Sequence, residues 1–269
     1  MSISRIDGGG TVTAVRADVA PKAPAETKPS LASIEKNYQV AEEGSKNWSA
    51  KAFGFIPMGG IGGERMLTIT EGKLLDNLTR DRGIMGLSKF KDIADQAFTV
   101  ADNRVPPAQT LPAHAEATIR QIVQQVPAEK RAATEANLRE SWPRNDGHND
   151  AFRHAYWNAT LTREFGVEWT KQFTTAHEGS NPGNSTREAM DLYNNEVGRQ
   201  IALDNPNASP QQLADLVKKA LDDGKLVVIA SNGHLAWSNN VANGNHGFTI
   251  NLDAAPDKIK TPAGNASAQ

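Results

Sequence analysis

Apolar residues recur at helical spacing through most of the chain. Leu31, Ile34 and Tyr38 would share the inner face of one short helix, and comparable stripes follow downstream. After residue 145 these stripes are framed by residues that start or stop helices. Longer helices are predicted over residues 70–81, 87–102, 113–125, 128–141, 148–165, 168–177, 186–203 and 210–223.

Glycine, proline and capping residues mark the predicted boundaries. Gly83 follows the first of the longer helices, and three prolines make residues 106–112 a linker. Gly166 is a C-terminal helix stop. Ser209 and Gln212 form a capping box, with a proline at the first helical position between them.

The last part of the chain changes from helical to strand periodicity. Residues 226–229 and 234–237 are two short apolar runs, and the turn between them contains Asn232-Gly233. An Asn-Gly pair between apolar runs is the strongest short hairpin signal. The predicted fold is therefore mainly α, a helical bundle-like domain with a small C-terminal β-hairpin.

Composition shifts divide the chain into four predicted segments. Residues 1–30 and 254–269 have no apolar periodicity, so they are interpreted as disordered N- and C-terminal tails. Residues 31–142 are predicted to form a helical N-terminal region, and residues 143–253 a separate domain.

An apolar, glycine-rich segment lies at residues 53–63. It lacks the Gly-Lys-Ser/Thr ending of a phosphate-binding loop, which excludes that function. We interpret it as a buried irregular linker, with a membrane-touching loop as the alternative.

Composition narrows the function classes. The 269-residue chain has no cysteine and a formal net charge of −2. The lack of cysteine excludes disulfide scaffolds, thiolate metal sites and a cysteine nucleophile. The slightly acidic balance disfavours nucleic acid as a partner, because such binding normally needs a basic surface. No apolar run reaches the roughly 18 residues of a membrane span, and no secretory signal precedes the helices.

Polar residues recur on one face of the helix predicted over 148–165. Asp150, His154 and Asn158 follow one another at intervals of four and lie beside Trp157, so the polar row borders the buried stripe. Buried polar groups need partners, which makes this row a candidate site. The plain alternative is that Asp150 complements the helix dipole and His154 is a hydrogen-bonded core residue.

Two further helices carry unexplained polar groups. His177 and Glu178 end one helix at Gly179, and neighbouring side chains can reach one site there only if the helix stops at it. Asp191 and Asn195 form an (i, i+4) pair on the next helix, where two adjacent asparagines are unfavourable for helix formation. A solvated helix face is the alternative.

Together these helices predict a metal site. The expected ligands are His154, His177, Glu178 and Asp191, which suit Zn, Mn, Fe or Ni as the divalent ion. An open coordination position would activate water for hydrolysis. A metal-free pair with His154 as general base competes with this hypothesis. The expected catalytic residues are His154, Asp150, Glu178, Arg153 and Arg199, with His148, Asn194 and Asn195 lining the site.

Several strings in this region resemble a bacterial domain of unknown function. They are GHNDAFRHAYWNATLTREFG, TTAHEGS, EAMDLYNNEVGRQIAL and NGHLAWS, and together they span roughly residues 145–240. Such domains typically end secreted, toxin-like proteins, including candidate type VI secretion effectors. The residues carried over by motif are Asp150, Arg153, His154, His177, Glu178, Asp191, Asn194, Asn195 and Arg199.

The resemblance implies an antibacterial effector in which residues 143–253 form the toxin-like catalytic domain. It would be cytoplasmic before export and secreted without a signal peptide. A component of a secretion apparatus and an immunity protein would be its partners. We expect a metal-assisted hydrolase of cell-envelope material, phospholipid or peptidoglycan, in which Arg153 or Arg199 stabilises an anion. A nuclease toxin, a non-catalytic helical binding module and a membrane-active protein are the alternatives.

Overall fold

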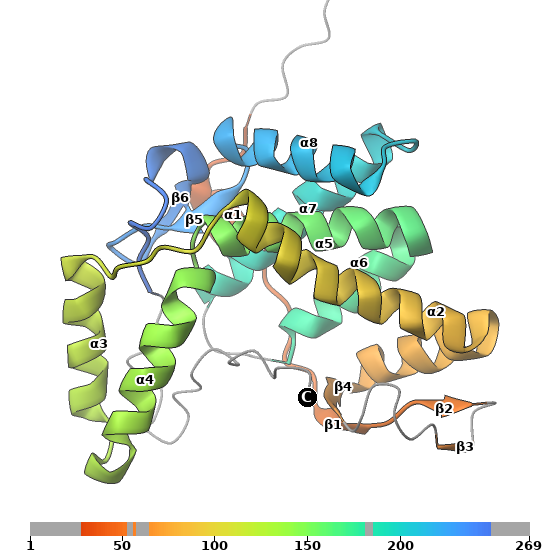
Figure 1. The fold of residues 1–269 in the computed structure, drawn as a ribbon, viewed down its shortest axis with the longest axis horizontal. Helices are drawn as coiled ribbons and strands as arrows, with labels where there is room; N and C mark the ends of the chain where they lie inside the picture. The colour runs from red at the N-terminus through yellow and green to blue at the C-terminus, as the bar shows by residue number, and fades with distance from the viewer. Residues whose placement is uncertain (1–27, 53–55, 58–64, 181–184, 249–269) are drawn as a thin grey trace, which may run out of the picture.

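The computed structural model describes residues 28–52, 56–57, 65–180 and 185–248 (Figure 1). The α-helices of this part are α1 (Leu31–Asn37), α2 (Ile69–Arg104), α3 (Ala113–Gln125), α4 (Arg131–Ser141), α5 (His148–Phe165), α6 (Val167–Glu178), α7 (Ser185–Asp204) and α8 (Pro210–Asp222). The strands are β1 (Ser45–Trp48), β2 (Lys51–Ala52), β3 (Ile56–Pro57), β4 (Arg65–Thr68), β5 (Val227–Ile229) and β6 (Leu235–Trp237). Short 3₁₀ helices occur at η1 (Ala128–Lys130), η2 (Trp142–Arg144) and η3 (Ser238–Asn240). The predicted mainly α fold is confirmed.

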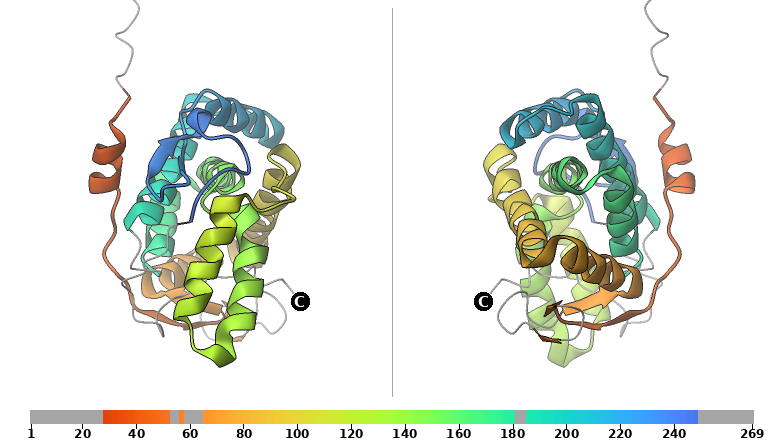
Figure 2. Two further views of the ribbon diagram at one scale, coloured as in Figure 1. Left: turned by 90° about the vertical axis from the view of Figure 1, so that its left-hand side faces the viewer. Right: turned by 90° about the vertical axis from the view of Figure 1, so that its right-hand side faces the viewer.

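Helix α5 is the centre of the molecule. It is buried along most of its length, and α2, α6, α7 and α8 pack around it. Figure 2 shows α5 nearly end-on, encircled by the other helices. A helix buried on all sides has no solvated face, so its polar residues must find partners inside the protein.

Helices α5 and α7 approach each other unusually closely at Gly198. A Cβ atom on Gly198 would lie 2.1 Å from the carbonyl oxygen of Ala155 on α5. Glycine therefore permits a backbone-to-backbone contact that a side chain would prevent. This contact sets the distance between the two helices that carry most of the predicted site.

Helix α2 is broken in the middle. Gly83 has φ 64° and ψ −164°, which are outside the helical region, so two helical arms meet at this residue. The two predicted helices and the stop at Gly83 are confirmed. Thr68 and Glu71 form a capping box at the start of the first arm.

Strands β1 and β4 were not expected from the sequence. They pair antiparallel, with Ser45 opposite Thr68 and Trp48 opposite Arg65. Each strand has only four residues, too few for a clear alternation of apolar and polar positions. Of the glycine-rich segment 53–63, only residues 56–57 lie within the described residues, where they form β3 and pair with β2.

The C-terminal hairpin agrees with the prediction. Val227 pairs with Trp237 and Ile229 with Leu235 in an antiparallel register. Gly233 in the connecting turn has φ 81°, a conformation that side chains rarely adopt. Strand β5 is completely buried and packs against α7.

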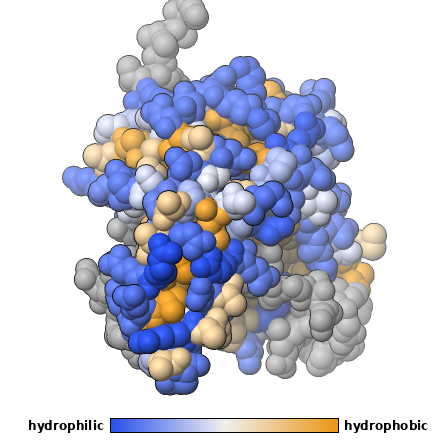
Figure 3. Space-filling model, turned by 60° about the vertical axis from the view of Figure 1, so that its left-hand side comes forward, coloured by the Kyte–Doolittle hydropathy of each residue, from blue (hydrophilic) through white to orange (hydrophobic). Residues whose placement is uncertain are grey.

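The hydrophobic core joins the N- and C-terminal parts. Buried residues of α2 share one apolar cluster with α5, α7, α8 and β5, so the core is not divided at the predicted boundary near residue 143. Helices α3 and α4 have a smaller cluster of their own, which includes Trp142 and Phe248. On the face shown in Figure 3, hydrophobic residues form small patches among hydrophilic ones.

The two predicted tails, residues 1–30 and 254–269, lie almost entirely outside the described residues. Among the described helices, none combines the length and the apolar character needed to cross a bilayer.

Candidate metal centre

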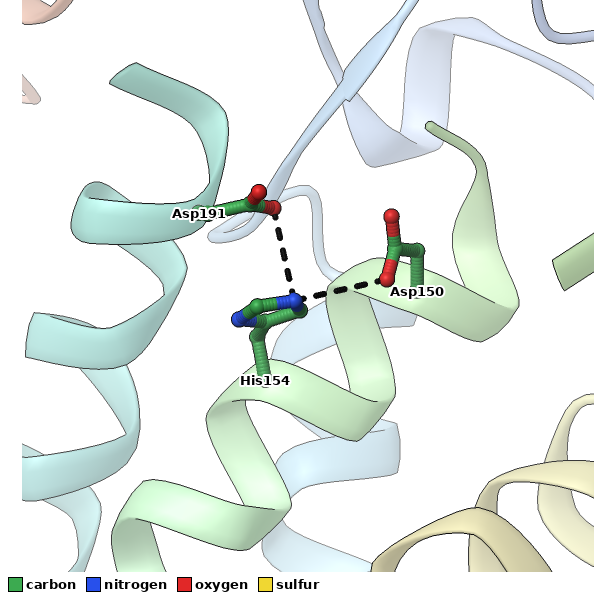
Figure 4. A group of neighbouring side chains, drawn as sticks. All are labelled: Asp150, His154 and Asp191. Carbon is green, nitrogen blue, oxygen red and sulfur yellow. Dashed lines mark ion pairs between the residues drawn. The ribbon is translucent and has the colours of Figure 1, made fainter. Parts of the chain in front are cut away.

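Three buried side chains converge where α5 faces α7 (Figure 4). His154 Nε2 lies 3.4 Å from Asp150 Oδ1 and 3.6 Å from Asp191 Oδ1. A cation bound at about 2.1 Å by tetrahedral ligands would separate those ligands by about 3.4 Å. The two separations from His154 Nε2 match this value, and the ligand atoms of the three residues all lie within 4.8 Å of one another, so this group could hold a metal.

The local structure of α5 orients Asp150. Its Oδ2 atom accepts a hydrogen bond from the Asp146 backbone N–H at 2.8 Å, just before the helix begins. Its Oδ1 atom is left to face His154 and also accepts a hydrogen bond from Arg153 Nη2. A carboxylate oxygen has two lone pairs, so Asp150 Oδ1 can serve Arg153 and an ion together.

The second ring nitrogen of His154 is held by the adjacent helices. His154 Nδ1 lies 3.2 Å from Asn195 Oδ1 and 3.7 Å from Glu178 Oε1. Both neighbours accept hydrogen bonds, so Nδ1 is the nitrogen that would carry the proton of the neutral ring. The Nε2 lone pair then faces the two aspartates, an arrangement typical of metal-binding histidines.

Asp191 has a buried oxygen without a hydrogen-bond donor. Among the described residues, no donor lies within hydrogen-bond distance of Asp191 Oδ1, which forms a longer ion pair with His154 Nε2 at 3.6 Å. Leaving a buried acceptor without a hydrogen bond costs about 1–3 kcal/mol. A bound cation would satisfy this atom.

The ionisation of the cluster depends strongly on its burial. Burial opposes charge on His154, but the nearby carboxylates of Asp191 and Asp150 raise its pKa to about 9. Burial, together with Glu178 and Asp150, raises the pKa of Asp191 well above its usual range. Asp150 is also buried, yet Arg153 and His154 hold its pKa far below the usual value. With a pKa of about 9, the His154 ring carries a proton at neutral pH, and a metal ion that binds at Nε2 would have to displace it.

The two neighbouring residues His177 and Glu178 are placed differently. Glu178 reaches the cluster beside His154 and accepts a hydrogen bond from Asn195 Nδ2 at 3.3 Å. The His177 ring turns to Glu71, with Nδ1 2.9 Å from Glu71 Oε1, and its edge packs against Trp157. The structure therefore does not place His177 with the other predicted ligands.

The two arginines also separate. Arg153 contacts Asp150 directly, and its guanidinium lies over the Phe98 ring. Arg199 is two helical turns away from Asp191, about 12 Å along α7, where it donates hydrogen bonds to Asn158 Oδ1 and Thr174 Oγ1. Burial lowers the pKa of Arg199. Only Arg153 lies at the cluster.

His148 and Asn194 support the fold rather than the cluster. His148 Nε2 lies 2.8 Å from the Ser238 carbonyl oxygen. Asn194 donates to the Val227 carbonyl and accepts from the Val227 N–H, so its amide completes the edge of β5. Asn195, by contrast, joins His154, Glu178 and Asn158 in one hydrogen-bonded network.

Asn194→Ala is expected to destabilise the protein without affecting metal binding. The substitution leaves the buried N–H and C=O of Val227 without partners, which should cost about 2–4 kcal/mol in the free energy of unfolding. Chemical denaturation and metal analysis of the folded protein would measure both effects. Loss of metal at unchanged stability would contradict this assignment.

The sequence analysis missed three residues that shape this region. Asp146, two residues before α5, has φ 64°, and its carboxylate pairs with Arg187 at 2.5–2.6 Å. Arg187 precedes Asp191 by one helical turn, and this spacing was a usable signal. Glu71, the partner of His177, is distant in sequence and gave no signal.

A protein family described as a domain of unknown function, DUF6973, matches residues 113–225. The matched region contains Asp150, His154, Glu178 and Asp191. The expected resemblance to a domain of unknown function therefore agrees with this match. No curated protein and no solved structure shows significant similarity to the chain.

Proposed function

We propose that this protein is a metal-assisted hydrolase whose divalent ion is held by Asp150, His154 and Asp191. The observation that carries the proposal is the convergence of three ligand atoms, one of which, Asp191 Oδ1, has no hydrogen-bond donor among the described residues. Two carboxylates and one imidazole suit Zn²⁺, Mn²⁺ or Fe²⁺.

The charges around the cluster support the same conclusion. Asp150, Asp191 and Glu178 bring three carboxyl groups into a buried space where Arg153 is the contacting arginine. Arg187 pairs with Asp146 and also favours the charged form of Asp191. Buried charges persist only when they are paired, and a divalent cation that displaced the proton of His154 would pair with these carboxylates.

Three protein ligands leave coordination positions for water, and an ion in such a site supplies water activated for hydrolysis. Arg153 is the residue best placed to stabilise negative charge that develops beside Asp150. Glu178 and Asn195 would fix the His154 ring through its Nδ1 side.

Asp191→Asn tests the metal site. We expect the wild type to bind about one equivalent of Zn²⁺ or Mn²⁺, and the variant to bind at least about 100-fold more weakly because it loses an anionic ligand. The wild type should gain about 2.7 kcal/mol of stability at a metal concentration 100 times the dissociation constant, and the variant should gain none.

Asp204→Asn is the matched control, because Asp204 lies at the exposed end of the same helix. It should bind metal like the wild type. In chelator, Asp191→Asn should be at least as stable as the wild type, since burial disfavours the charge that it removes. Equal metal binding by Asp191→Asn and the wild type would exclude the proposed site.

We further propose a toxin-like role on cell-envelope material, supported by the motif resemblance. Production in the periplasm of a bacterial host should then stop growth, whereas production in the cytoplasm should not. Asp191→Asn should abolish this toxicity. A secretion apparatus component and an immunity protein are the proposed partners. Toxicity only in the cytoplasm would instead favour the nuclease alternative.

A further inference from the structure

A cavity of about 240 Å³ lies beside Arg153, the residue that contacts Asp150 of the metal cluster. It is lined by residues of both arms of α2, of β1 and β4, and of α5 and α6. Most of its wall is apolar, including Leu75, Leu87, Trp157 and Phe173. Protein interiors are close-packed, and apolar cavities of about 150 Å³ already bind benzene. A cavity of this size is large enough for an apolar ligand.

The polar groups of the cavity wall are few and mostly cationic. Arg65, Lys91, Arg153 and His177 line it, together with two carboxylates, Glu71 and Asp95, and Asp95 forms an ion pair with Lys91. Both Glu71 oxygens are engaged within the protein, Oε2 by the Thr68 N–H and Oε1 by His177. A ligand with an apolar body and one anionic end would match this wall.

Arg153 connects the cavity to the metal cluster. Its guanidinium lies over the ring of Phe98, which is 41% exposed and also lines the cavity. At the same time Arg153 Nη2 contacts Asp150 Oδ1, the oxygen that faces His154. Only one carboxylate therefore separates the cationic end of the cavity from the centre of the cluster. Arg153 Nε, moreover, has no acceptor among the described residues.

We propose that this cavity binds the acyl chain of a single-chain anionic amphiphile, with the carbonyl or carboxylate end toward Arg153. Binding of the acyl chain stands by itself. The inference rests on the proposed hydrolase function only where it makes an acyl ester bound in the cavity the substrate. Glycan and peptide strands are polar and would not match an apolar wall, so the cavity selects lipid over peptidoglycan among cell-envelope materials.

The reaction that follows is ester hydrolysis. The oxygen of water bonds to the acyl carbonyl carbon, the bond from that carbon to the alcohol oxygen breaks, and the alcohol oxygen receives a proton from the water. The products are a free alcohol and a fatty acid, which releases the second proton of the water to solvent so that its carboxylate lies at Arg153. Arg153 is positioned to hold the carbonyl oxygen as negative charge develops on it.

A chain-length series tests binding to the full chain of the protein. Octanoate, decanoate, dodecanoate and tetradecanoate are titrated below their micelle concentrations in a calorimeter. Each additional buried methylene should strengthen binding about fourfold until the cavity is full. Affinity that does not depend on chain length would overturn the proposal.

Two variants of α2 and one control variant of the same helix test whether the ligand occupies this cavity. Leu87→Trp should fill the cavity and abolish the binding of dodecanoate. Lys91→Glu should weaken it by about two- to fivefold, whereas Lys89→Glu, the same charge change at an exposed residue that does not line the cavity, should have no effect. Equal effects of the two lysine variants would overturn the assignment of the cationic rim, even if Leu87→Trp did not fold.

A lysophospholipid with a dodecanoyl chain tests whether the natural ligand is a lipid ester or a free fatty acid. Cleavage to dodecanoate in the presence of Zn²⁺ or Mn²⁺ supports the lipid as substrate, and binding of dodecanoate alone would overturn that role. Metal content is measured in the same samples. Metal binding without acyl binding would refute only this inference, and acyl binding without metal would refute only the proposed hydrolase.

Discussion

His154→Gln should abolish metal binding and hydrolysis while the protein stays folded. Glutamine can keep a hydrogen bond to Asn195 or Glu178, but it does not readily replace an imidazole as a metal ligand. We expect the affinity for Zn²⁺ or Mn²⁺ to fall at least about 100-fold and the hydrolytic rate to fall in parallel. Metal titration and activity are measured on protein whose melting temperature in chelator is known.

His148→Gln is the matched control, because it makes the same change six residues earlier on the same buried helix. His148 contacts the Ser238 carbonyl and not the cluster, so this variant should keep its metal. If His154→Gln were fully active, His154 would be neither a ligand nor a base. If it only lowered the melting temperature, the polar row would be a structural network, as in a non-catalytic binding module.

Gly198→Ala should destabilise the protein by about 3 kcal/mol or more. In an isolated helix the same change would stabilise by about 1 kcal/mol, because glycine is a poor helix former. Here the new Cβ would lie 2.1 Å from the Ala155 carbonyl oxygen, and backbone atoms cannot rotate away as a side chain can. Helices α5 and α7 would have to separate.

The free energy of unfolding from chemical denaturation measures this effect. Gly44→Ala is the control, since a Cβ there meets nothing within 4 Å. Residual folded Gly198→Ala protein should also bind metal more weakly, because Asp191 on α7 would move away from His154 on α5. A stability equal to that of the wild type would show that the contact between the helices can relax without cost.

The periodic and punctuated elements were predictable because their causes are local. The helices matching α5 and α7, the break at Gly83 and the hairpin across Asn232-Gly233 follow from spacing, capping and turn chemistry. Asp150 and His154 share a face because they are four residues apart on one helix. The pairing of β1 with β4 was missed, because it joins four-residue strands separated by a segment with no strand pattern.

The sequence by itself determined which helices form and which polar residues each one carries. The tertiary structure alone decided which residues of different helices meet. Successive residues on a helix point about 100° apart, so His177 and Glu178 could not both face His154. Packing turned Glu178 inward and paired His177 with Glu71. The approach of α7 to α5, which Gly198 permits, brings Asp191 to His154, because contacts between helices depend on backbone distance and not on local spacing.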